Sequence, residues 1–210
     1  MITAIPGFLG HPRDWDFLRD AGLEVDAIDF SLATRIEAGE LLLGYSMGGR
    51  LALEALARGA RFERAVIVSA GLNLESRRDE RRERDEAWAR RFESDPWDDV
   101  VRDWNAQPVF GGHEMRRLER DYDRAALARA LRAFSPGVLE PLAPRLARID
   151  VPVLWIAGER DTAYVEVAHR AVGILPRAEL WICPGAGHRV PWEQPEPFTR
   201  RLREFLESKA

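Results

Sequence analysis

The chain has 210 residues and a formal net charge of −4 at pH 7, with 46% hydrophobic and 31% charged residues. This length suits one domain, or one domain with an insertion, and the composition is that of a globular protein with enough apolar material for a core. The weakly acidic charge argues against nucleic acid as a partner. The single cysteine, Cys183, excludes an intrachain disulfide.

The first residues, MITAIPGFLG, have neither the basic start nor the long apolar stretch of a signal peptide. No run approaches the length of a membrane span. We therefore expect a cytoplasmic protein without membrane insertion, present as a monomer or a weak homo-oligomer. The sequence implies no metal and no cofactor.

Short apolar runs alternate with helical patterns at both ends of the chain. Buried strands are expected at residues 1–5, 24–30, 40–45, 64–70, 151–158 and 178–185. Helices are expected at residues 14–21, 48–59, 164–175 and 196–208. Near-continuous apolar strands alternating with helices are typical of a parallel sheet flanked by helices, which is an α/β fold.

The alternation stops between residues 72 and 146, where the patterns predict only helices, at residues 75–93, 98–105, 114–121 and 124–134. We therefore divide the chain into an α/β core, residues 1–71 and 147–210, and a helical lid, residues 72–146, inserted mid-chain. Only a short connection, residues 31–39, precedes the strand at 40–45, so the core is trimmed there.

The motif GYSMG places Ser46 directly after a predicted strand and directly before a predicted helix. A serine on such a tight turn is typical of a catalytic nucleophile, because small neighbours such as Gly44 and Gly48 leave room for the strained backbone. The alternative is an ordinary loop serine. The rest of the chain has to distinguish between the two.

A catalytic serine needs a base, and the base needs an orienting acid. His188 lies in a glycine-rich loop after the last predicted strand, and Asp161 follows the strand before it. Asp150 is a rival acid, but it precedes its strand. Because the carboxyl ends of parallel strands share one edge of the sheet, we expect Ser46, Asp161 and His188 to meet there.

The order Ser, Asp, His along the chain is that of the α/β hydrolases. In that fold two backbone N–H groups form an oxyanion hole. The residue after the serine, Met47, would supply one donor, and the loop PGFLGHPRDW would supply the other, for which Phe8 is the best candidate.

Several stretches together carry a narrower resemblance: GFLGHPRDW, GYSMGGRLALEAL, RRERDEAWARRFE with WNAQPVF, GERD and GAGH. In these stretches the chain resembles the SHCHC (2-succinyl-6-hydroxy-2,4-cyclohexadiene-1-carboxylate) synthases of menaquinone biosynthesis. The chain departs from most of that family in having Pro6-Gly7 where His-Gly is usual, and in the short connection before the strand at 40–45.

This resemblance implies a lyase on a hydrolase scaffold. The triad serine would act as a base rather than an acyl acceptor. It would remove a proton from the substrate ring and expel pyruvate from an enolpyruvyl group, with no cofactor. The substrate would be a small polycarboxylate.

Arginines are the candidate ligands for its carboxylates. Arg50 lies one helical turn after Ser46 in a segment that should be buried, and a buried guanidinium needs an anionic or hydrogen-bonding partner. Arg81 and Arg84 continue the stripe of Trp88 in the lid. The alternatives are structural partners for Arg50 and i,i+4 ion pairs, such as Arg81 with Asp85, on the lid helix.

Tyr45 would line the pocket or simply pack. Two rival functions stay open: a carboxylesterase or other small-ester hydrolase that forms an acyl-serine, and a non-enzymatic binding protein. Arginines facing the pocket would favour the lyase, because a neutral ester offers them no charge.

Overall fold

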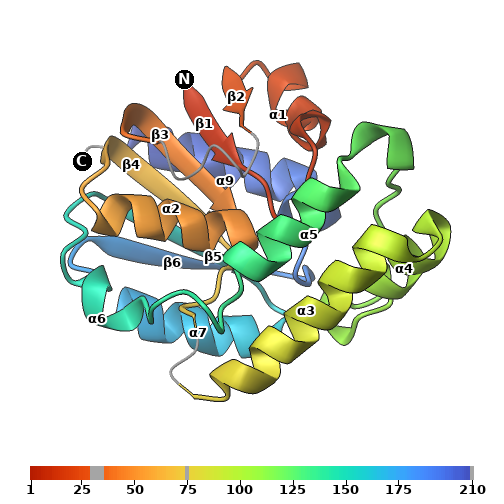
Figure 1. Cartoon of the computed structure of the whole chain (residues 1–210). Coiled ribbons are helices and arrows are strands. Elements are labelled where there is room, and N and C mark those ends of the chain that lie inside the picture. Colours follow the sequence, from red (N-terminus) through yellow and green to blue (C-terminus); the bar gives the residue numbers. More distant parts are fainter. Residues whose placement is uncertain (29–35, 74–75, 209–210) are drawn as a thin grey trace. The chain divides into compact units, whose positions relative to one another are not determined.

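The computed structural model describes residues 1–28, 36–73 and 76–208 (Figure 1). The chain divides into two compact units, Met1–Gly71 with Leu142–Ala210 and Leu72–Pro141. Residues 142–146 thus group with the first unit, whereas the sequence suggested placing them in the helical lid. The reason is that α6 (Ala143–Leu146) packs against α2 (Met47–Ala57), where Arg145 forms a bidentate ion pair with Glu54.

The described part of the first unit contains one sheet of six strands in the order β2-β1-β3-β4-β5-β6, and every neighbouring pair is parallel. The strands are β1 (Ile2–Ile5), β2 (Val25–Ala27), β3 (Ala38–Tyr45), β4 (Arg61–Val68), β5 (Val153–Gly158) and β6 (Ala178–Cys183). The predicted α/β class with a parallel sheet is confirmed. Residues 29–35, which include the end of one expected strand and most of the short connection, lie outside the described residues.

Helices cover both faces of this sheet. One face carries α1 (Asp16–Asp20) and α9 (Pro195–Glu207), and the other carries α2 and α7 (Thr162–Val172) (Figure 1). The short elements η1 (Pro12–Trp15) and α8 (Val190–Glu193) complete the unit. The expected helix at residues 14–21 is therefore split into a 3₁₀ turn, whose N-cap is His11, and the short helix α1.

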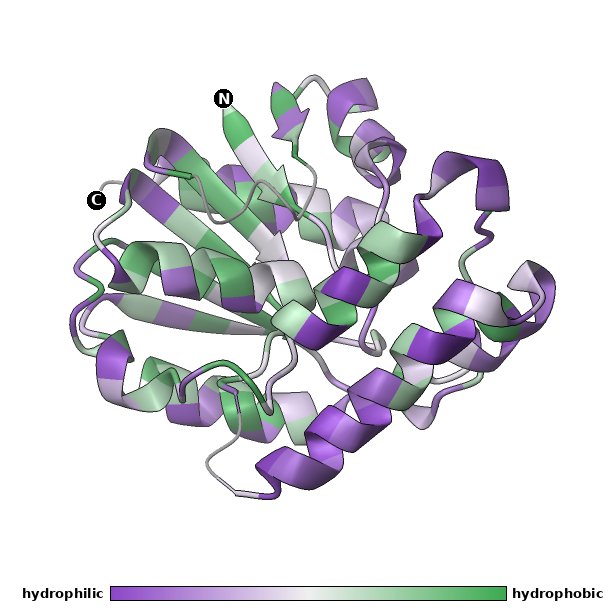
Figure 2. Ribbon diagram, in the orientation of Figure 1, coloured by the Kyte–Doolittle hydropathy of each residue, from purple (hydrophilic) through white to green (hydrophobic). Residues whose placement is uncertain are grey.

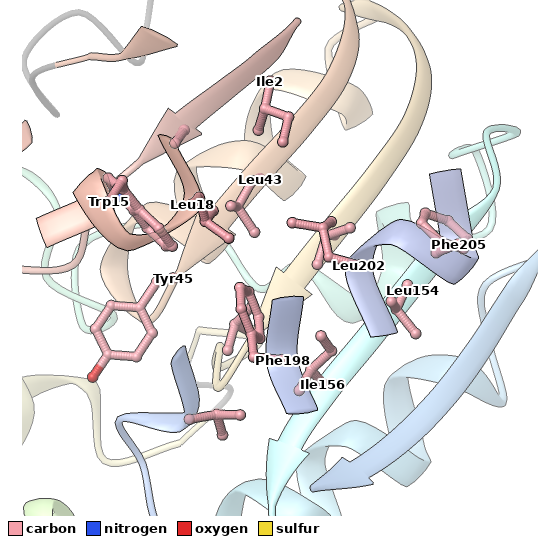
Figure 3. Close-up of a cluster of buried hydrophobic side chains, with 14 of the residues drawn as sticks. Ile2, Trp15, Leu18, Leu43, Tyr45, Leu154, Ile156, Phe198, Leu202 and Phe205 are labelled. Atoms are coloured by element: carbon pink, nitrogen blue, oxygen red, sulfur yellow. The ribbon is translucent and has the colours of Figure 1, made fainter. Parts of the chain in front are cut away.

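The core on the α9 face is built from alternate strand residues and large side chains of the helices (Figure 3). Leu43, Leu154 and Ile156 of the sheet meet Trp15 and Leu18 from the first connection and Phe198, Leu202 and Phe205 from α9. Figure 2 shows the sheet as mostly hydrophobic. Burial of this apolar surface stabilises the sheet that carries the site, at about 25 cal/mol per Å² removed from water.

The second unit is helical, with α3 (Arg78–Ser94), α4 (Trp97–Asn105) and α5 (Arg124–Ala133), and the 3₁₀ turns η3 (Pro108–Phe110) and η4 (Glu119–Asp121). Phe92, Trp97 and Trp104 pack edge to face in its centre. Arg132 of α5 pairs with both Glu86 and Glu93 of α3. The bond from Arg132 to Glu86, with a smaller effect of Arg90, lowers the pKa of Glu86 to about 2.

The helix expected at residues 114–121 is wrong, because only η4 forms there. Two side chains of α4 hold the backbone before it. Asn105 accepts a hydrogen bond from the N–H of Met115 and donates one to its carbonyl, and Trp97 Nε1 donates to the carbonyl of Arg117. Backbone N–H and C=O groups that are hydrogen-bonded to side chains are not available for the hydrogen bonds of a helix.

Within the described ranges, no helix combines the length and apolar character that a bilayer span requires.

Candidate active site

Ser46 occupies the turn between β3 and α2 with a left-handed backbone, φ 51° and ψ −112°. Its N–H donates to the carbonyl of Val68 on the neighbouring strand at 2.8 Å. Such a conformation costs about 1–3 kcal/mol for a non-glycine residue and persists only where the surroundings enforce it. The turn therefore points to a functional serine rather than to an ordinary loop serine.

The two motif glycines are required by close backbone approach. A Cβ at Gly44 would lie 2.6 Å from the carbonyl oxygen of Gly48. A Cβ at Gly48 would lie 2.2 Å from the carbonyl oxygen of Ile5 and 2.4 Å from that of Pro6. The first turn of α2 is thus pressed against the end of β1, as the sequence motif predicts.

In the first unit, His188 lies within hydrogen-bond distance of both Ser46 and Asp161. His188 Nε2 is 3.1 Å from Ser46 Oγ, and His188 Nδ1 is 2.6 Å from Asp161 Oδ2. His188 follows β6 and is 2% exposed, and Asp161 follows β5 at the N-cap position of α7. Because a carboxylate accepts from Nδ1–H, Nε2 is the nitrogen that can accept the serine proton.

Two aromatic rings enclose the imidazole of His188. The Tyr45 ring centroid is 5.6 Å from that of His188, and the Tyr164 centroid is 4.5 Å from it in an edge-to-face arrangement. Tyr164 was missed in the sequence. Its only signal is an aromatic side chain three residues after Asp161, at the first turn of α7.

The Tyr45 hydroxyl is buried, and the side chain of Arg189 lies close to it. Burial raises the pKa of Tyr45 well above its usual value, and the charge of Arg189 opposes the rise. The phenol therefore stays protonated and available as a donor. Its ring also contacts Trp192 at 4.8 Å, so packing fixes its orientation.

The loop after β1 is the expected source of an oxyanion-hole donor. It turns tightly, with the N–H of Gly10 donating to the carbonyl of Gly7, and Leu9 has a positive φ of 58°. Because Gly48 touches Ile5 and Pro6, the N-terminus of α2 at Met47 lies beside the start of this loop. Helix N-termini carry partial positive charge, which suits a developing oxyanion.

The predicted arginines fall in different units. Arg50 lies in α2 of the first unit and is only 7% exposed. In the second unit, both oxygens of buried Asp85 accept from Arg81 Nε, at 3.0 and 2.9 Å. Arg84 is exposed. Figure 2 shows α3 as hydrophilic over most of its length, and its buried positions are Asp85, Ala89 and Phe92 rather than the stripe through Arg84.

A parallel sheet with a strained serine turn, followed by an acid and a histidine after two later strands, defines an α/β hydrolase. The model of the alpha/beta hydrolase family matches residues 4–201. Among solved structures, MenH from S. aureus aligns with a TM-score of 0.86 at 24% identity, over 98% of this chain and 92% of that chain. A thermophilic esterase from Thermogutta terrifontis aligns with a TM-score of 0.75 at 18% identity, over 98% and 88%. These two likenesses concern the fold.

A 2-succinyl-6-hydroxy-2,4-cyclohexadiene-1-carboxylate synthase of Escherichia coli O7:K1 is 34% identical to the chain over 174 residues, which is 79% of this chain and 67% of that relative. The chain therefore belongs to the alpha/beta hydrolase family and, within it, to the family of these synthases. The resemblance seen in the sequence is confirmed.

Proposed function

We propose that the chain is a SHCHC synthase, a carbon–oxygen lyase that eliminates pyruvate from an enolpyruvyl cyclohexene polycarboxylate. The observation that carries the proposal is the assembled chain of hydrogen bonds from Ser46 through His188 to Asp161, in a member of the synthase family. No cofactor enters the proposed reaction.

In the proposed reaction Ser46 acts as the base. Its hydroxyl proton passes to His188 Nε2 as Ser46 Oγ takes a proton from the substrate ring. The electron pair of the broken C–H bond forms a new ring double bond, and the C–O bond to the enolpyruvyl group breaks, so that pyruvate departs as its enolate. His188 Nε2 gives the proton that it took from Ser46 to this enolate, so both residues end in their starting protonation states and no water is consumed.

The surroundings of the trio, Ser46, His188 and Asp161, suit this role. Asp161 stabilises the imidazolium that forms on His188, and the rings of Tyr45 and Tyr164 limit access of water to it. Loss of a proton next to the succinyl carbonyl moves negative charge to oxygen. The N–H groups of Phe8 and Met47 are the proposed donors to that oxygen.

Each carboxylate of the substrate needs a donor. Arg50 is the first candidate, since it is a buried guanidinium one turn from Ser46. Tyr45 would add a neutral hydrogen bond. The second unit would act as the lid, with Arg81 and Arg84 as further ligands. Because Arg81 already holds Asp85, a substrate carboxylate would have to share that guanidinium.

The test compares two reactions in one preparation: pyruvate release from the enolpyruvyl polycarboxylate and hydrolysis of a neutral p-nitrophenyl ester. We expect pyruvate release, and a loss of at least about a thousandfold in kcat for Ser46→Ala with the fold intact. An Asp150→Asn variant, which changes the exposed carboxylate before β5, is the control and should retain full activity.

Efficient ester hydrolysis without pyruvate release would replace the lyase with a carboxylesterase. Near-wild-type turnover by Ser46→Ala would remove Ser46 from the mechanism.

A further inference from the structure

The carboxylate of Glu193 lies beneath the loop that carries His188. Its Oε2 accepts from the N–H of Gly187 at 2.7 Å, and its Oε1 accepts from the N–H of Arg189 at 2.9 Å. These N–H groups belong to the residues directly before and directly after His188. Glu193 therefore fixes the backbone on both sides of the histidine.

The Glu193 side chain is held in place on its other sides. It is 6% exposed, and Arg160 donates to its Oε2 at 2.7 Å. The neighbouring Trp192 anchors α8, because its Nε1 donates to the carbonyl of Asp14 at 2.8 Å. A Cβ at Gly187 would lie 3.1 Å from both carboxylate oxygens, so glycine leaves the room that Glu193 needs.

Arg160 links this carboxylate to the acid of the trio. It directly precedes Asp161, and its own N–H donates to the carbonyl of Ala186 at 2.9 Å. Glu159, one residue earlier, accepts from the N–H of Gly185 at 2.9 Å, and its N–H donates to the carbonyl of Cys183. The turn that carries Asp161 and the loop that carries His188 are thus joined by several bonds.

We propose that Glu193 is a positioning residue, which sets the backbone of His188 so that its ring spans Ser46 and Asp161. Water would not hold both N–H groups with the direction and stiffness that one buried carboxylate gives, and charge-assisted bonds are about twice as strong as neutral ones. A shift of about 1 Å at a catalytic group can cost roughly a hundredfold in rate. The inference rests on the proposed role of His188 as the proton acceptor of Ser46.

The test measures how well His188 activates Ser46 without using the proposed substrate. A fluorophosphonate probe forms a bond from Ser46 Oγ to phosphorus, fluoride leaves, and His188 takes the serine proton. Mass spectrometry gives the rate constant of labelling, kinact, and the probe affinity, KI. Glu193→Ala should lower kinact roughly tenfold to a hundredfold with KI unchanged, and Glu193→Gln, which keeps one acceptor oxygen, should lower it less.

Glu54→Gln is the matched control, because Glu54 is also a buried carboxylate paired with an arginine, Arg145, but does not touch the loop of His188. It should lower the melting temperature and leave kinact within about twofold. If Glu193→Ala does not fold, Glu193→Gln, which keeps the volume of the side chain, decides.

Three results would overturn the proposal: an unchanged kinact in the folded Glu193 variants, an equal fall in Glu54→Gln, or no labelling of the wild-type Ser46. Normal labelling without pyruvate release would instead reject the proposed lyase and leave the role of Glu193 standing.

Discussion

The contact between Gly48 and the end of β1 allows one substitution to be worked through from the structure. In Gly48→Ala the new Cβ would lie 2.2 Å from the carbonyl oxygen of Ile5, 2.4 Å from that of Pro6 and 2.7 Å from the carbonyl carbon of Ile5. Carbon–oxygen contacts in proteins are about 3.3 Å or longer. The first turn of α2 and the end of β1 would therefore have to separate by about 1 Å.

This separation cannot be relieved by a change of rotamer, because the contacted atoms are all backbone. β1 also pairs with a strand on each side, β2 and β3, so its movement strains two ladders. Overpacking costs about 1–3 kcal/mol, and we expect the upper end. For a chain of this size about 3 kcal/mol lowers Tm by roughly 6–12 °C. The same shift moves Met47 away from the loop of Phe8 and should lower kcat roughly a hundredfold.

The assay is thermal unfolding beside pyruvate release for Gly48→Ala and a control, Gly22→Ala. Gly22 has φ +82° and no atom within 4 Å of an added Cβ, so its substitution adds only backbone strain of about 1 kcal/mol and should leave kcat unchanged. A Gly48→Ala variant with wild-type Tm and kcat would refute the reasoning. So would equal losses in both variants.

Two further predictions follow from charged groups. Arg50→Ala should lower kcat/KM for the polycarboxylate by roughly tenfold to a hundredfold, since a charge-assisted contact is worth about 1.5–3 kcal/mol. Arg50→Lys should recover part of this loss, and hydrolysis of a neutral ester should change little. Equal losses on both substrates would show that Arg50 has a structural role. Because the pKa of Glu86 is about 2 in the folded chain against 4.5 normally, its pair with Arg132 stabilises the fold above about pH 4.5 and is lost as the pH falls toward 2. Acid unfolding followed by circular dichroism should therefore begin at a higher pH in Arg132→Gln, and coincident curves would contradict this.

Much of the sheet could be predicted from the sequence because the residues that identify a buried strand lie within the strand itself. A buried stretch of a parallel strand is apolar, so the later parts of β3 and β4 and the whole of β5 are marked by their own residues. The chemistry of Ser46, Asp161 and His188 depends on residue type, and their places after strands bring them to one edge of the sheet. Their meeting within 3.1 Å follows from topology.

The second unit was harder to predict because its structure depends on partners distant in the sequence. The amphipathic residues 114–121 have a helical pattern, but bonds from Trp97 and Asn105 compete for the backbone there. On α3 the periodicity suggested a stripe through Arg84, whereas Arg84 is exposed and the neighbouring Asp85 is buried and paired with Arg81. A charge that is buried with its partner cannot be recognised from a hydrophobic pattern alone.

The same distinction explains why Glu193 was missed beside a histidine that was found. Glu193 accepts from the backbone N–H groups of Gly187 and Arg189. Every residue except proline has such an N–H group, so the sequence does not show which residues donate to a buried carboxylate. Sequence patterns identify the side chains that react, because only a few residue types can do that chemistry. The groups that position those side chains act through the backbone. Such a group becomes recognisable only when the fold has brought a buried carboxylate and its donors together.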